Sequence, residues 1–191
     1  MLAEQIRVVM TVAEALESLG APYALGGALA GALFGVLRAT NDADLLAELH
    51  PAQVEPLVRA LGSAFCADPE MMRGAIDRRG SLNLIHLAAM FKADVFVARP
   101  RDFDRAQLAR RKTVRLSADS EQEIYVTSAE DLVLAKLEWY RLGGEISDRR
   151  WSDVLGVLRI QDERLDRDYM RRTAIGLGVG DLLERALEQV G

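Results

Sequence analysis

Two aspartates separated by one residue are the part of this sequence best suited to chemistry. Asp42 and Asp44 flank Ala43, and Leu45 and Leu46 follow directly. If the segment is a strand, successive side chains alternate between faces, so both carboxylates point the same way, about 6.5–7 Å apart. That spacing suits one hard cation, or two cations roughly 3.5–4 Å apart. Because the two like charges repel each other, we expect a positive group to lie between them.

A third aspartate stands in a later apolar segment, Met90–Ala98. Asp94 is out of place there, because a buried carboxylate costs free energy unless it is paired or binds a metal. Taken alone, Asp94 could equally cap an element or face solvent on an edge strand. Together with Asp42 and Asp44, it favours a functional cluster of three carboxylates.

The elements that must position these carboxylates can be predicted from hydrophobic periodicity. Apolar residues repeat with helical spacing near the N-terminus and with strand-like alternation further along the chain. Strands are expected at Tyr23–Leu25, Asp42–Ala47, Ser81–Leu87, Met90–Ala98, Thr113–Leu116 and Glu123–Val126. Helices are expected at residues 2–19, after Gly26-Gly27 in a segment that includes Gly31 and Gly35, and at Pro51–Leu61, Pro69–Arg79 and Arg101–Arg111.

The character of the sequence changes near residue 126. Thr127-x-x-Glu130 has the pattern of a capping box and predicts a helix that runs through Tyr140. Further helices are expected from Ser147 to about Ile160 and within Asp166–Gln189. The sequence therefore predicts a core of strands and helices at 1–126 and an all-helical region at 127–191.

Length and composition indicate an ordinary globular protein. The chain has 191 residues, half of them hydrophobic, and its net charge of −5 argues against non-specific binding to nucleic acid. Cys66 is the single cysteine, so no disulfide framework is expected, and the residue should be small and buried. The best membrane candidate, Tyr23–Leu37, is fifteen residues long, short of the ~20 needed to span a bilayer. With no signal peptide visible, a cytoplasmic protein without a membrane partner is expected.

The order of these motifs resembles the nucleotidyltransferase superfamily related to DNA polymerase beta. Its pattern is a glycine pair, or glycine–serine, at a strand–helix turn, then acid-x-acid on the next strand and a third acid later. Gly26-Gly27, Asp42-x-Asp44 and Asp94 match this pattern in order. Two departures are Ala43, where a larger aliphatic residue is common, and Gly27, which replaces the serine of many members.

Within the superfamily, the closest likeness is to the AbiEii-type branch of abortive-infection and toxin–antitoxin proteins. In that branch an arginine and a threonine precede the paired aspartates, as Arg38 and Thr40 do here. The helix that opens at Ser128 and carries Lys136 also resembles the branch, as does Gly143-Gly144-Glu145 through Trp151-x-Asp153. The likeness covers roughly residues 20–160.

The resemblance implies both a fold and a reaction. The implied fold is α+β, a mixed β-sheet flanked by helices, with a C-terminal helical region packed on this core. The implied reaction moves a nucleoside monophosphate from an NTP to an acceptor hydroxyl with Mg²⁺, or alternatively Mn²⁺, as cofactor. The acceptor would be tRNA, a protein or a small molecule, and an antitoxin is a further partner of the branch. The implied catalytic and metal-binding residues are Asp42, Asp44 and Asp94, and the implied nucleotide-binding residues are Gly26, Gly27, Arg38, Thr40 and Lys136.

Two other interpretations stay open. A regulatory module could keep the fold and bind nucleotide without turnover, although three intact carboxylates argue against it. A metal-binding protein of other chemistry would leave Gly26-Gly27 and Arg38 unexplained. The arginines and lysine between residues 99 and 115 are typical of a solvated face, but they could also follow the backbone of an RNA acceptor.

Overall fold

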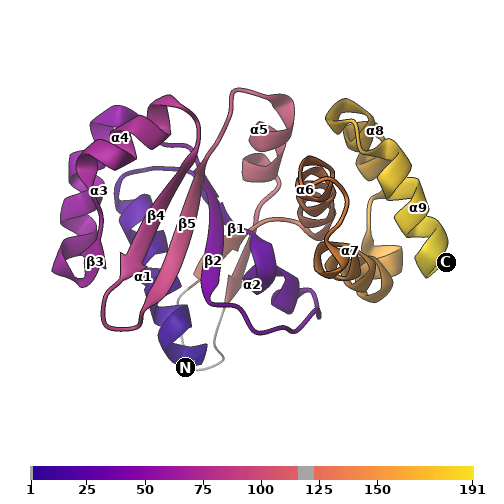
Figure 1. The fold of residues 1–191 in the computed structure, drawn as a ribbon, viewed down its shortest axis with the longest axis horizontal. Coiled ribbons are helices and arrows are strands. Elements are labelled where there is room, and N and C mark those ends of the chain that lie inside the picture. The colour runs from indigo at the N-terminus through magenta and orange to yellow at the C-terminus, as the bar shows by residue number, and fades with distance from the viewer. Residues whose placement is uncertain (1, 116–122) are drawn as a thin grey trace. The chain divides into compact units, whose positions relative to one another are not determined.

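The structure is a computed structural model that describes residues 2–115 and 123–191 (Figure 1). The chain forms two compact units. The sheet unit contains residues 1–26 and 40–126, and the helical unit contains residues 27–39 and 127–191. The sequence did not predict that residues 27–39 would group with the C-terminal helices. A domain boundary at residue 126 stays a prediction.

The strands of the sheet unit form one mixed sheet, in the order β3-β4-β5-β2-β1-β7-β6. Strand β2 is parallel to β5 and β1 is parallel to β7, while the other neighbouring pairs are antiparallel. The predicted α+β class with a mixed sheet is confirmed. The strands are β1 (Tyr23–Leu25), β2 (Asp42–Ala47), β3 (Phe65–Cys66), β4 (Ser81–His86), β5 (Phe91–Val97), β6 (Lys112–Arg115) and β7 (Glu123–Val126).

Four α-helices of the described residues accompany this sheet: α1 (Leu2–Ser18), α3 (Val54–Leu61), α4 (Pro69–Asp77) and α5 (Asp102–Ala109). Helix α1 contacts α3 and β5, and α5 contacts β1 and β2. Helices α3 and α4 lie side by side, with α4 against β4 (Figure 1). The sheet is therefore covered by helices that come from several parts of the chain.

Strand β2 buries one face and uses the other for polar residues. Burial alternates along the strand, as expected when successive side chains point to opposite faces. The second face carries Asp42, Asp44 and Leu46, of which Leu46 packs against Ala98 and against Leu108 of α5. Helix α5 thus reaches the end of this face beyond the two aspartates. The buried face consists of Ala43, Leu45 and Ala47.

The helical unit contains α2 (Gly27–Leu33), α6 (Ala129–Leu142), α7 (Asp148–Gln161), α8 (Arg167–Leu177) and α9 (Gly180–Val190). Helix α6 contacts each of the other four, and α7 also contacts α9. Within the described ranges, no helix combines the length and the apolar character that a membrane span requires.

Several local details differ from the sequence predictions. The cap of α6 is Ser128, whose hydroxyl accepts a hydrogen bond from the Asp131 N–H at 3.1 Å, and not Thr127. Helix α2 ends at Leu33, so Gly35 lies in the segment after it. Cys66 is exposed on β3, a strand of two residues at the edge of the sheet. Leu116, expected at the end of a strand, lies outside the described residues.

Candidate functional site

The three predicted carboxylates lie on one face of two neighbouring strands. Strands β2 and β5 are parallel, and their register places Asp44 opposite Asp94 and Asp42 opposite Lys92. Side chains at paired positions of adjacent strands point to the same face, and the strands lie about 4.8 Å apart. The four residues therefore form a square of three acids and one lysine, which we call the acidic face.

Lys92 supplies the positive charge that the paired aspartates require. Its Nζ lies 2.7 Å from Oδ2 of Asp94. The hydrogen bond with the Asp94 carboxylate raises the pKa of Lys92, partial burial opposes this, and attraction to Asp94, Asp42 and Asp44 adds to the rise. The ammonium is thus held in the field of all three carboxylates. The sequence predicted a positive group between Asp42 and Asp44, whereas Lys92 pairs with Asp94 and only attracts the other two.

The two oxygens of Asp94 have different surroundings. While Oδ2 binds Lys92, Oδ1 is buried and has no hydrogen-bond partner among the described residues. A buried carboxylate oxygen without a partner is costly, and such atoms mark places where a ligand, ion or water belongs. Asp94 therefore has an oxygen available for a cation or for a substrate hydroxyl.

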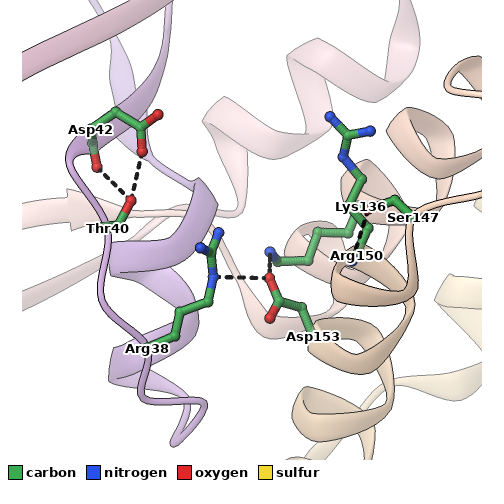
Figure 2. A network of polar contacts seen from close by, with 7 residues as sticks. All are labelled: Arg38, Thr40, Asp42, Lys136, Ser147, Arg150 and Asp153. Atoms are coloured by element: carbon green, nitrogen blue, oxygen red, sulfur yellow. Dashed lines mark hydrogen bonds and ion pairs between the residues drawn. The ribbon is translucent and has the colours of Figure 1, made fainter.

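Thr40 fixes the carboxylate of Asp42. Its hydroxyl donates to Oδ1 of Asp42 at 2.6 Å, and also lies 3.2 Å from the Asp42 carbonyl oxygen (Figure 2). The Thr40 carbonyl in turn accepts a hydrogen bond from the Gln5 side chain at 3.3 Å. Thr40 thus contacts a predicted catalytic residue in this structure, whereas its direct contact with nucleotide stays a prediction.

The glycine pair is tied to the acidic strand. The N–H of Gly26 donates to the carbonyl of Asp44 at 2.7 Å, so this donor is already used within the sheet unit. Gly27 begins α2 with a φ of +59°. Residues other than glycine adopt this backbone conformation only at a cost in free energy. Binding of phosphate by the pair stays a prediction, and Gly27 is the member whose backbone conformation requires glycine.

The helical unit contains a cluster of opposite composition, which we call the basic cluster. Oδ2 of Asp153 lies 2.7 Å from Nζ of Lys136 and 3.3 Å from Nε of Arg38 (Figure 2). The side chains of Asp153 and Lys136 are only 9% and 11% exposed. In the described part of the chain, Nη1 of Arg38 is buried without a hydrogen-bond partner. The cluster therefore has net positive charge and an unused donor, as an anion-binding site would.

Close packing fixes Arg38 against α7. A Cβ on Gly35 would lie 2.9 Å from Cγ2 of Ile160, and a Cβ on Gly156 would lie 2.9 Å from Cγ2 of Val36. The Gln161 side chain also donates to the Phe34 carbonyl at 3.2 Å. These contacts hold the segment after α2 on the helix that carries Asp153.

The donor atoms of the acidic face are of the type that binds a divalent cation. Carboxylate oxygens are the ligands that Mg²⁺ prefers, and the unpartnered Oδ1 of Asp94 agrees with such a role. Yet no three acidic, histidine or cysteine side chains of the described residues converge as a metal cluster. Lys92 holds Asp94 and Thr40 holds Asp42 instead. The residue types therefore fit a divalent cation. In this structure, however, the side chains are arranged around Lys92, which partly neutralises their charge.

Sequence reasoning did not identify Lys92 in the acidic face, the partners of Asp153 in the basic cluster, or Asn83 beside the acidic face. Lys92 could have been found, because it stands two residues before Asp94 and so shares its face of the strand. Asp153 was noticed only as part of a resemblance, since its partners lie on other elements. Asn83 of β4 is paired with Asp94 and exposed beside it, which depends on a register that the sequence does not specify.

Comparisons with known proteins identify the fold. No protein-family model matches the sequence, and no curated protein matches it either. The solution structure of ANT(2'')-Ia, an antibiotic-resistance factor, aligns with a TM-score of 0.55 over 99% of this chain and 97% of its own, at 14% identity. An antigenic nucleotidyltransferase-like protein from Paracoccidioides brasiliensis aligns with a TM-score of 0.55 over 82% of this chain and 75% of its own, at 19% identity.

A crystal structure of ANT(2'')-Ia in complex with adenylyl-2''-tobramycin also aligns, with a TM-score of 0.54 over 91% of this chain and 97% of its own, at 11% identity. The chain has a nucleotidyltransferase fold. The acidic face lies on two neighbouring strands of this nucleotidyltransferase sheet. At identities of 11–19% the likeness establishes the fold alone, so membership of the AbiEii-type branch stays a prediction.

Proposed function

We propose that this protein transfers a nucleoside monophosphate from an NTP to an acceptor hydroxyl. The observation that carries the proposal is the register of β2 and β5, which aligns Asp44 with Asp94 and leaves Asp42 on the same face. Three carboxylates on one face of this fold have no evident structural purpose, because like charges side by side destabilise a sheet. A regulatory module without turnover would not need them.

Asp42, Asp44 and Asp94 would hold Mg²⁺, for which Mn²⁺ can substitute. When bound, the cation neutralises charge on the triphosphate and on the leaving pyrophosphate. The acceptor oxygen forms a bond to the α-phosphorus, the bond from that phosphorus to the bridging oxygen breaks, and pyrophosphate leaves with the electron pair. Asp94 is the residue we assign as acceptor of the hydroxyl proton, because its Oδ1 has no hydrogen-bond partner in the described residues.

Arg38 and Lys136 would bind the phosphates of the nucleotide. The unused Nη1 of Arg38 supports this role, since a guanidinium offers several donors in a plane that matches phosphate oxygens. Asp153 is a positioning residue in this account, because its carboxylate holds both cations in the absence of substrate. Thr40 would orient Asp42, and Gly26 and Gly27 would approach the nucleotide through their backbone.

Two acceptor classes have support. ANT(2'')-Ia carries its adenylyl group on tobramycin, which makes a small molecule with hydroxyl groups the first class. The AbiEii-type branch would instead imply a tRNA or protein acceptor and an antitoxin partner. That alternative is supported by the ion pair between Lys136 and Asp153, which joins two of the sequence features that resemble the branch. Against an RNA acceptor, Arg101 and Arg105 of the basic run form ion pairs with Asp104 and Asp102.

Labelling with radioactive nucleotides tests the proposal. The protein is incubated with each α-³²P-labelled NTP, Mg²⁺ or Mn²⁺, and in turn total tRNA, cell extract and a panel of polyhydroxylated antibiotics. The wild type should label one acceptor class and release pyrophosphate, and Asp44→Asn should abolish both. Asp77→Asn, which removes the same charge at an exposed helix end, should leave labelling unchanged. Nucleotide binding without any labelled acceptor would favour the regulatory module instead.

A further inference from the structure

Lys92 is the residue of the acidic face that the proposed reaction does not use. The face has four corners, with Asp42 opposite Lys92 and Asp44 opposite Asp94. The lysine side chain reaches diagonally from its own corner, because its Nζ contacts the carboxylate of Asp94 at 2.7 Å. It therefore occupies an oxygen of a residue that the cation would need.

The choice of lysine at this position is unusual for the chain. Of its 24 basic residues only three are lysines, at positions 92, 112 and 136. The buried Asp104 is paired with Arg101, and the buried Asp153 is paired with Arg38 as well as Lys136. Arginine holds a carboxylate with a rigid fork, whereas lysine makes a point contact on a flexible stem. A lysine is thus the cation that a carboxylate can exchange most readily.

Exposure also favours exchange. The Lys92 side chain is 41% exposed and that of Asp94 is 13% exposed. The ammonium can therefore leave Asp94 for water without loss of its hydration, while the carboxylate stays in the sheet. Oδ1 of Asp94 already lacks a hydrogen-bond partner among the described residues. Once Lys92 leaves Oδ2, both carboxylate oxygens of Asp94 can bind the cation.

We propose that Lys92 is a built-in counter-ion, which neutralises part of the charge of the acidic face until a divalent cation displaces its ammonium from Asp94. This inference rests on the metal site of the proposed function. Lys92 stays protonated throughout, and what changes is the partner of Asp94. Two consequences follow from the charges. Without Lys92 the metal-free face is destabilised by three like charges, and the face binds a divalent cation more tightly because a competitor and a repulsive charge are both gone.

The test measures metal binding and stability in the absence of nucleotide. Mn²⁺ affinity is measured by isothermal titration and by electron paramagnetic resonance, and the melting temperature is measured without metal. Lys92→Met should bind Mn²⁺ at least about tenfold more tightly than the wild type. Its metal-free melting temperature should fall by about 2–4 °C, which is the fall that a loss of roughly 1 kcal/mol of stability produces in a chain of this size. Lys92→Gln provides a second neutral variant should the methionine variant not fold.

Two further variants serve as controls. Lys112→Met removes the same charge at an exposed position on β6, the far edge strand of the sheet, and should change neither quantity. Lys92→Arg keeps the positive charge, now on a forked guanidinium group. This variant should bind Mn²⁺ no more tightly than the wild type.

The outcomes separate this inference from the proposed function. If the wild type binds Mn²⁺ and the neutral variants bind it no more tightly, the counter-ion role is wrong and the metal site stands. An unchanged metal-free melting temperature in both neutral variants would also overturn the role. If neither the wild type nor the neutral variants bind Mn²⁺, the metal assignment and the counter-ion role both fail.

Discussion

The acidic face and the basic cluster solve the same electrostatic problem in opposite ways. On the acidic face, the ammonium of Lys92, whose side chain is 41% exposed, pairs with Asp94 and is attracted to Asp42 and Asp44. In the basic cluster, Lys136 and Arg38 share the carboxylate of Asp153, which is 9% exposed. Each cluster thus contains a single residue of the opposite charge. The difference in exposure suggests a difference in purpose, with an exchangeable counter-ion in the first and a structural one in the second.

The comparison predicts its largest effect at Asp153. Replacing Asp153 by alanine leaves the nearly buried Lys136 without its counter-charge, and loss of one partner from such a pair costs about 3 kcal/mol. The free energy of unfolding, measured by urea denaturation, should fall by that amount. Glu188→Ala, at an exposed position of the same unit, should be close to neutral.

A double variant sharpens the same contrast. Lys136→Met combined with Asp153→Leu removes the nearly buried pair and leaves only Arg38, which is 26% exposed, without its partner, so it should recover most of the stability lost in Asp153→Ala. A loss below about 1 kcal/mol in Asp153→Ala would show that this pair behaves like an exposed one, and would remove the proposed difference between the clusters.

A smaller effect is expected from the packing that holds Arg38. Gly35→Ala places a Cβ 2.9 Å from Ile160 at a residue whose φ is +96°, and the combined clash and strain should cost about 2 kcal/mol. The basic cluster should be disturbed, so NTP affinity should fall while Mn²⁺ affinity is kept. Gly176→Ala lies in α8 with open space around its Cβ, and should stabilise the protein by about 0.5–1 kcal/mol. Equal effects of the two substitutions would contradict the assigned packing.

The smallest expected effect concerns the orientation of one acid. Thr40→Val keeps the shape of the side chain and removes the hydroxyl that donates to Asp42. The transfer rate should fall about tenfold, equivalent to ~1.4 kcal/mol, while the unfolding free energy changes by ~1 kcal/mol or less. Thr40→Ser keeps the donor and should retain the rate. A valine variant as fast as the wild type would mean that Asp42 needs no orientation by Thr40.

Much of the sheet could be predicted from the sequence because its strands are clearly marked. Strands β1, β2 and β7 have the expected bounds, since turn-forming residues and alternation mark their ends. The segment β3 was missed, because two residues cannot show a period. The cap of α6 was assigned to Thr127, although the adjacent Ser128 is equally suited chemically and only the structure distinguishes them.

The candidate site was predictable as residue types and not as contacts. Alternation alone places Asp42 with Asp44, but the pairing of Asp44 with Asp94 depends on the register of strands some fifty residues apart in sequence. The contact between Lys136 and Asp153 depends on how α6 packs against α7, which no local pattern specifies. Long-range packing therefore decides which charged residues become partners.

A crystal structure with Mn²⁺ and a non-hydrolysable NTP analogue tests the central claim most directly. The account predicts anomalous scattering from Mn²⁺ within coordination distance of Asp42, Asp44 and Asp94, with Lys92 moved away from Asp94 and the phosphates bound by Arg38 and Lys136. Mn²⁺ and nucleotide bound elsewhere, with Lys92 still paired to Asp94, would contradict it.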